Sequence, residues 1–301
     1  MSIKYEILKR GAKLIGIKKR SQKPVSEIIE IKKKENAKIT VPDIKDEKIA
    51  SEVIGVMGFK VLRLKHKKKT EKANLFIIGG GMVSAPKPMS IRKALRICKQ
   101  TGIDLYIPYY PLCTDYPVSK AYEMIYETYK KMLEEYEPEN ISLLGTSSGG
   151  NLALGLIAYM NDIQSPLPRP RYILAISPGT CPSNEEEKKR MRELDEKDVA
   201  ISAKYMITAE EIMKHGEEVP DYMIRLQNGD FTGCPQTDFI YGTEEVLYAV
   251  APSFRKAMEK YHVNARFFEG EGMFHCYPVF PICKEAKEGW DLMVKLLKEN
   301  G

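Results

Sequence analysis

The chain has 301 residues, of which 43% are hydrophobic and 29% charged, a composition typical of a folded globular domain. No apolar run approaches the ~20 residues that a membrane-spanning helix needs, which argues against an integral membrane protein. The net charge is +6, but eleven Lys or Arg residues and only three acidic residues precede residue 35, so the rest of the chain is slightly acidic. This asymmetry argues against a nucleic-acid-binding surface spread over the whole protein.

The basic N-terminal segment, residues 1–46, has apolar residues at helical spacing with lysines between them. These apolar residues are Ile3, Ile7, Leu8, Leu14 and Ile15. Such a helix can lie on a membrane surface or a partner, or it can cap the rest of the protein and point its lysines to water. We expect a cap, because Gly11 and Gly16 would weaken a free-standing helix.

The N-terminus and the cysteines bear on where the protein resides. No apolar core with a small-residue cleavage site follows the N-terminus, so we expect a cytoplasmic protein with reduced cysteines. None of the six cysteines forms a C-x-x-C pair, and no cluster of His and Asp is evident. The sequence therefore predicts neither a metal site nor a cofactor.

Strands and helices alternate after the N-terminal segment. The predicted strands are 60–64, 74–78, 105–108, 141–144, 171–176, 239–241 and 265–268. The predicted helices include 90–101, 117–135, 149–161, 246–261 and 283–300. Short continuous apolar strands between helices indicate an α/β fold with a mostly parallel central sheet flanked by helices. We expect one such domain over residues 47–301, with a polar insertion at about 182–234 that carries its own structure and helps to wall a site.

The segment Gly145-Thr146-Ser147-Ser148-Gly149-Gly150 joins a predicted strand to a predicted helix. A G-x-S-x-G pattern at this place is typical of a nucleophile elbow, in which the glycines allow a tight turn and the central serine is exposed. N–H groups of the helix N-terminus lie beside such a serine and favour developing negative charge. We predict that Ser147 is a nucleophile; the alternative is a glycine-rich turn with an incidental serine.

A serine nucleophile needs a base, and the base needs an orienting acid. Among four histidines, His275 lies in a glycine-containing loop after the last predicted strand, from which it could reach the serine, whereas we expect His66 to be exposed in its lysine-rich run. The acid is expected after the preceding strand, where Glu244 and Glu245 follow each other. Spacing alone does not choose between these two carboxylates.

A third requirement is a set of N–H donors for the oxyanion that forms when a serine attacks an acyl group. The predicted strand 74–78 ends in a run of three glycines, and the N–H groups of Gly79 and Gly80, with that of Ser148, are the predicted donors. The competing interpretation is a phosphate-binding loop. It is poorly supported, because no Gly-Lys-Ser/Thr follows and the next residues include prolines.

The order of these motifs resembles the hormone-sensitive-lipase-like family of α/β-hydrolases, which contains many bacterial carboxylesterases. That family has a His-Gly-Gly-Gly loop, a tyrosine-led strand exit, a Gly-Asp-Ser-Ala-Gly-Gly elbow, an acid loop and a Gly-Met-x-His loop. The corresponding segments here are 78–81, 110–117, 145–150, 242–247 and 271–275. The resemblance aligns the family's acid with Glu245 and implies a variable cap in the N-terminal segment.

The chain departs from the family pattern at four positions. Ile78 stands in place of the histidine before the glycines, Thr146 and Ser148 replace Asp and Ala around the nucleophile, and Glu245 replaces the commoner Asp. None of these changes removes the nucleophile, the base or the acid.

The resemblance implies a serine carboxylic-ester hydrolase that acts on small or short-acyl esters through a Ser147–His275–Glu245 triad and an acyl-enzyme, without a cofactor. Two other readings remain open. One is a non-catalytic small-molecule-binding protein on the same scaffold, and the other is a membrane-surface lipase held by the basic N-terminus. A homodimer is a further expectation from the family.

Overall fold

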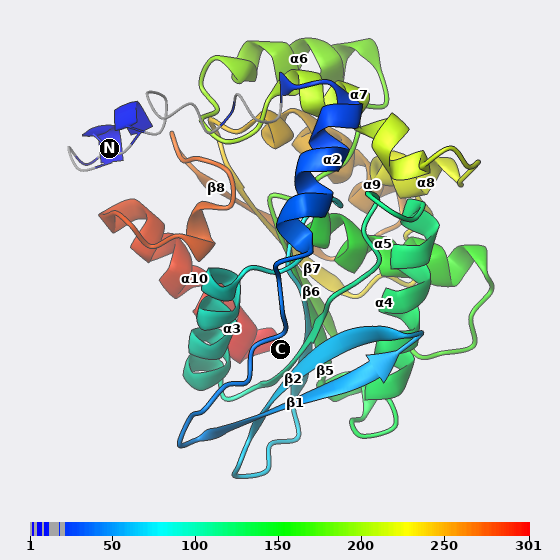
Figure 1. The fold of residues 1–301 in the computed structure, drawn as a ribbon, viewed down its shortest axis with the longest axis vertical. Coiled ribbons are helices and arrows are strands. Elements are labelled where there is room, and N and C mark those ends of the chain that lie inside the picture. Colours follow the sequence, from blue (N-terminus) through cyan, green and yellow to red (C-terminus); the bar gives the residue numbers. More distant parts are fainter. Residues whose placement is uncertain (1, 3–4, 8, 12–17, 19–21) are drawn as a thin grey trace.

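One eight-stranded sheet runs through the centre of the protein (Figure 1), in a computed structural model that describes residues 2, 5–7, 9–11, 18 and 22–301. In sheet order the strands are β1 (Ile49–Val56), β2 (Phe59–His66), β4 (Asp104–Pro108), β3 (Ala73–Ile77), β5 (Ile141–Thr146), β6 (Tyr172–Ile176), β7 (Gln236–Gly242) and β8 (Ala265–Gly270). β2 is antiparallel to both β1 and β4, and all later pairings are parallel. The predicted α/β fold with a mostly parallel sheet is therefore confirmed.

All the predicted strands are present, but β1 has no counterpart among them. It lies at the edge of the sheet, where most of its side chains are exposed or half-buried, and it contains Ser51, Glu52 and Gly55. Such a strand lacks the continuous apolar run that identifies a buried one. A two-residue turn at Met57 and Gly58, both with positive φ, joins it to β2, which is the usual geometry of a tight hairpin.

Helices cover both faces of the sheet because successive strand residues point to opposite sides. On one face, α3 (Pro88–Thr101) and α10 (Lys284–Asn300) pack in a hydrophobic cluster that includes Leu144 of β5. On the other, α4 (Val118–Met132), α5 (Ser148–Asp162) and α9 (Ala251–Lys260) pack in a cluster that includes Leu143, the preceding residue of the same strand. The two neighbours therefore belong to the two halves of the core.

The helix predicted over 246–261 is two elements in the structure. A 3₁₀ helix, η4 (Val246–Val250), precedes α9, and Pro252 lies in the first turn of α9. Proline has no N–H to donate and fits the first turn of a helix but not its interior. The regular helix therefore begins next to the proline rather than continuing through it.

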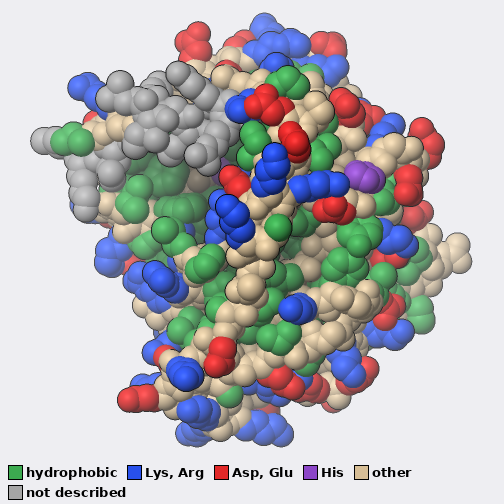
Figure 2. Space-filling model, in the orientation of Figure 1, with side chains coloured by type: hydrophobic (Ala, Val, Ile, Leu, Met, Phe, Trp, Pro, Cys, Tyr) green, Lys and Arg blue, Asp and Glu red, His purple; other side chains and the backbone are tan. Residues whose placement is uncertain are grey.

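The N-terminal segment contributes α2 (Val25–Asn36), which packs beside α7 (Ala203–Lys214). Of the predicted helical stripe, Ile3, Leu8, Leu14 and Ile15 lie outside the described residues, and Ile7 is exposed. Figure 2 shows basic and acidic side chains interspersed on the face that α2 crosses. In the portion of the chain that the structure describes, none of the helices has both the length and the apolar character needed to cross a membrane.

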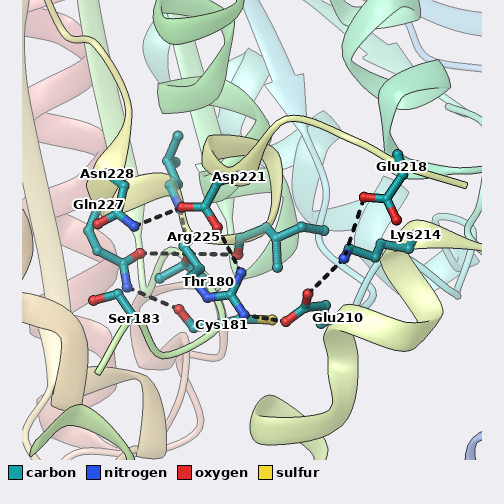
Figure 3. A network of polar contacts seen from close by, with 12 residues as sticks. Thr180, Cys181, Ser183, Glu210, Lys214, Glu218, Asp221, Arg225, Gln227 and Asn228 are labelled. Carbon is teal, nitrogen blue, oxygen red and sulfur yellow. Dashed lines mark hydrogen bonds and ion pairs between the residues drawn. The ribbon is translucent and has the colours of Figure 1, made fainter. Parts of the chain in front are cut away.

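The segment between β6 and β7 folds into α6 (Glu185–Asp195), α7, α8 (Asp221–Ile224) and a short 3₁₀ helix, η3 (Leu226–Asn228). A polar network ties this segment to the loop that follows β6 (Figure 3). Thr180 Oγ1 donates to Gln227 Oε1 at 2.9 Å, and Gln227 Nε2 donates to the Cys181 carbonyl at 3.0 Å. Arg225 links Asp221 with Glu210 of α7. The insertion is thus held against the carboxyl edge of the sheet.

The first turn of α5 lies directly against β3. A methyl group on Gly149 would come within 2.0 Å of the Ile77 carbonyl oxygen, and one on Gly145 within 2.3 Å of the Gly149 carbonyl oxygen. These atoms belong to the backbones of a central strand and the buried turn of a helix, so they cannot move aside cheaply. Only glycine fits at either position.

We predict that Gly149→Ala lowers the free energy of unfolding by about 3 kcal/mol, because the added methyl group must push α5 away from β3. Denaturant unfolding followed by circular dichroism measures this loss. Gly55→Ala is the matched control, since a methyl group at this strand position meets no atom within 4 Å. Equal stabilities of the two variants would contradict the packing argument.

Candidate active site

Ser147 lies between the end of β5 and the start of α5, and its backbone is strained. Its φ of 54° and ψ of −126° lie outside the regions that residues with a side chain normally adopt. Backbone hydrogen bonds hold this conformation. The Ser147 N–H donates to the Ile176 carbonyl at 2.9 Å, and its own carbonyl accepts from the N–H groups of Gly150 and Gly179 at 2.8 and 2.9 Å. The predicted nucleophile therefore has a rigid backbone at the carboxyl edge of the sheet.

The structure brings Glu245 and His275 together. Glu245 Oε2 accepts a hydrogen bond from His275 Nδ1, so the second ring nitrogen, Nε2, remains to serve as a base. The other carboxylate oxygen, Oε1, accepts from Ser177 Oγ at 2.7 Å and from the Gly242 N–H at 2.9 Å. Glu245 is completely buried. Its carboxylate is thus fixed on three sides, and it fixes the imidazole in turn.

Glu244 points elsewhere. Its carboxylate forms an ion pair with Lys9 of the N-terminal segment, and its N–H donates to the Met273 carbonyl at 3.1 Å. Of the two carboxylates that spacing leaves open, it is Glu245 that contacts His275 in the structure.

Ser147 and His275 line one small cavity of about 220 Å³, together with the glycine loop and the start of α3. Among the described residues, His275 Nε2 has Cys276 Sγ as its hydrogen-bond partner, at 3.4 Å, rather than Ser147 Oγ. Cys276 is buried and has a positive φ of 54°. The imidazole therefore faces the cavity with its reactive nitrogen held by a neighbouring thiol.

Burial of the His275 ring disfavours its charged form, but the charges and hydrogen bonds of Cys276 and Glu245 act in the opposite direction and prevail. The pKa of His275 consequently lies well above its ordinary value.

The predicted oxyanion donors are occupied by side chains of the elbow. The Gly79 N–H donates to Thr146 Oγ1 and the Gly80 N–H to Ser148 Oγ, each at 3.0 Å. Thr146 and Ser148 are two of the residues at which this chain departs from the family pattern. The Ser148 N–H belongs to the first turn of α5, where N–H groups have no acceptor within the helix. All three predicted donors therefore lie beside Ser147, but two have intramolecular partners in this state.

Ser147 also lines a second cavity, of about 420 Å³. Its walls include Ile28 and Lys32 of α2 and Met206 and Met213 of α7. Tyr205 of α7 donates from its hydroxyl to the Gly81 carbonyl at 2.8 Å, which links the insertion to the glycine loop. Both the N-terminal segment and the insertion thus contribute walls to the space around the serine.

Sequence reasoning missed Ser177 and Cys276. Ser177 Oγ donates to Glu245 and accepts from the Cys276 N–H at 3.0 Å, so it connects the acid with the histidine loop. The sequence feature that could have identified Ser177 is its position directly after a predicted parallel strand, at the edge of the sheet where functional groups gather. Cys276 had the weaker signal of following His275. His66, which we expected to be exposed, is largely buried and pairs with Asp104 at 2.8 Å.

The residues that the structure describes include no group of three or more His, Cys, Asp or Glu side chains placed to hold a metal ion.

Comparisons with known proteins bear on the fold and the family of this chain. Residues 75–279 match the family described as alpha/beta hydrolase fold. An acetyl-hydrolase of Streptomyces hygroscopicus is 27% identical over 225 residues, which cover 71% of this chain and 72% of that protein.

Solved structures with the same fold include an esterase of the bacterial hormone-sensitive lipase family, with a TM-score of 0.79 and 19% identity over 100% of this chain and 99% of that one. A hormone-sensitive lipase from a metagenome library has a TM-score of 0.80 and 16% identity, and the match covers 98% of each chain. This chain therefore belongs to the α/β-hydrolase fold family, as a hydrolase similar to the esterases of the hormone-sensitive lipase group.

Proposed function

We propose that the protein is a serine carboxylic-ester hydrolase for small or short-acyl esters, with Ser147 as nucleophile, His275 as general base and Glu245 as the residue that orients His275. The observation that carries the proposal is the buried Glu245–His275 hydrogen bond, together with the cavity that His275 and Ser147 both line. The name of the acetyl-hydrolase relative supports a short acyl group.

In the proposed reaction, His275 Nε2 leaves Cys276 and accepts the Ser147 hydroxyl proton while Oγ forms a bond to the acyl carbon. The negative charge moves to the carbonyl oxygen, and the tetrahedral intermediate collapses when His275 returns the proton to the departing alcohol oxygen. Water then repeats the sequence on the acyl-enzyme and releases the acid. Glu245 stabilises the imidazolium at each proton transfer.

The oxyanion is proposed to bind at the N–H groups of Ser148, Gly79 and Gly80. In the free protein Gly79 and Gly80 donate to hydroxyls of the elbow, so the substrate oxygen must share or replace those bonds. A donor of this kind typically contributes about 3 kcal/mol to the transition state, more than a bond to a neutral hydroxyl is worth.

A non-catalytic binding protein is the second candidate. The observation that favours it is that the Gly79 and Gly80 N–H groups and His275 Nε2 all have intramolecular partners in the free protein. A fluorophosphonate probe separates the two functions. An esterase is labelled at Ser147 and a binding protein stays unlabelled.

We predict that Ser147→Ala lowers the rate of p-nitrophenyl acetate hydrolysis by about three orders of magnitude or more, because no other group replaces the nucleophile. Absorbance of released p-nitrophenol measures the rate, and thermal unfolding checks that the variant is folded. Ser165→Ala, just beyond the other end of α5, should keep the rate. A folded Ser147→Ala protein with near-normal turnover would refute the nucleophile.

The two adjacent glutamates allow a direct comparison. Glu245→Gln should lower kcat by about two to four orders of magnitude, because an amide cannot stabilise the imidazolium. Glu244→Gln should keep kcat within a few-fold, since Glu244 contacts Lys9 instead. Steady-state kinetics on one ester measures both variants, and the assignment fails if the two lose equal activity.

The raised pKa of His275 predicts a pH profile. A general base must be neutral, so kcat/KM should fall as the pH drops through the pKa of His275, at a pH above the ordinary value of 6.5. Cys276→Ala removes one cause of the raised pKa and should move this limb to lower pH. Cys98→Ala, at a buried thiol that contacts Leu64, is the control that should leave the limb in place. A limb that stays put in Cys276→Ala would show that the thiol does not act on His275.

A further inference from the structure

The small cavity beside His275 contains a lysine without an acidic partner. Its other walls are mainly glycine backbone and apolar side chains, among them Phe76, Ile78 and Val279. Lys93, from the second turn of α3, reaches into it, and none of the described residues that line this cavity is Asp or Glu. The cavity therefore carries a positive charge that its own walls do not balance.

Lys93 is partly buried, and its Nζ lies 3.3 Å from the centroid of the Phe280 ring. Among the described residues no carboxylate lies within ion-pair distance of Nζ, whereas Lys99 of the same helix pairs with Asp46 at 2.7 Å. Burial lowers the pKa of Lys93 to about 8. The electrostatic interaction with Cys276 is the opposing influence, which raises this pKa. The amine is still mostly charged at neutral pH.

A charged amine in such surroundings is costly unless it finds a partner. The aromatic ring of Phe280 offsets part of the cost through a cation–π contact. A negative group in the cavity would form a charge-assisted hydrogen bond with Nζ, which is the stronger interaction. The chemistry of the cavity thus fits a ligand that is both small and anionic.

The position of His275 indicates which half of an ester enters this cavity. His275 lines the small cavity and is absent from the walls of the large one. Because the imidazole must return its proton to the departing alcohol oxygen, that oxygen has to lie within reach of Nε2. The alcohol half is therefore placed in the small cavity, and the acyl half toward the large one, which Met206 and Met213 line.

We infer that the enzyme prefers esters whose alcohol half carries a carboxylate or a similar negative group, and that Lys93 binds this group. The inference rests on the proposed esterase function and adds a substrate class to it. Lys93 is then a specificity-determining residue rather than part of the triad.

The test compares two acetate esters of similar shape at neutral pH, m-acetoxybenzoate, which is an anion, and m-acetoxybenzamide, which is neutral. The intact protein should have the higher kcat/KM for the anion. Lys93→Met should lower the ratio of the two kcat/KM values by about 10- to 100-fold, the worth of a hydrogen bond to a charged group. Lys93→Arg should restore most of the ratio, and Lys99→Met, which removes the same charge from the same helix outside the cavity, should leave it unchanged.

Three results would overturn the inference. They are an absent preference in the intact protein, an unchanged ratio in Lys93→Met, and a Lys93-dependent preference for monophenyl succinate over phenyl butyrate, which would place the anion in the acyl half. If m-acetoxybenzamide is still hydrolysed and a fluorophosphonate still labels Ser147, such a result removes only the inference about Lys93, and the esterase function stands. Failure of hydrolysis and of labelling together would instead remove the proposed function.

Discussion

The close approach of α5 to β3 is the constraint on which the rest of the site depends. Gly145 and Gly149 have no side chains, so the turn between β5 and α5 fits against the Ile77 carbonyl. The turn forces Ser147 to a positive φ and aims the first N–H groups of α5 at the same space. The loops that follow β3, β6, β7 and β8 begin at this same edge of the sheet, and they bring the remaining groups to the serine.

The polar groups of the free site satisfy one another. Ser177 joins the acid to the histidine loop, the elbow hydroxyls accept from the glycine loop, and the Cys276 thiol contacts Nε2. Buried polar groups without partners are costly, which explains why these contacts form when no substrate is bound. A bound ester would exchange several of these bonds for bonds to a developing oxyanion, where they are stronger.

The uneven charge of the chain has a counterpart in the structure. Lysines of the basic N-terminal segment pair with acidic side chains of the rest of the protein, as Lys9 does with Glu244 and Lys33 with Asp115. These pairs, and the contribution of α2 to the large cavity, support the prediction that the segment is a cap. Lys93 differs from these lysines because it faces the small cavity, whose described lining includes no Asp or Glu.

The sequence by itself determined the strand and helix alternation, the elbow around Ser147, and the loops that carry Glu245 and His275, because each depends on local periodicity or on a short motif. It did not determine β1, whose pairing with β2 rather than its composition makes it a strand. Spacing left Glu244 and Glu245 open and the family resemblance favoured Glu245; in the tertiary structure it is Glu245 that contacts His275. The tertiary structure alone revealed Ser177, Cys276 and Lys93 at the site. Those contacts join segments far apart in the chain, and only the packing of strands and helices sets which loops meet at the edge of the sheet.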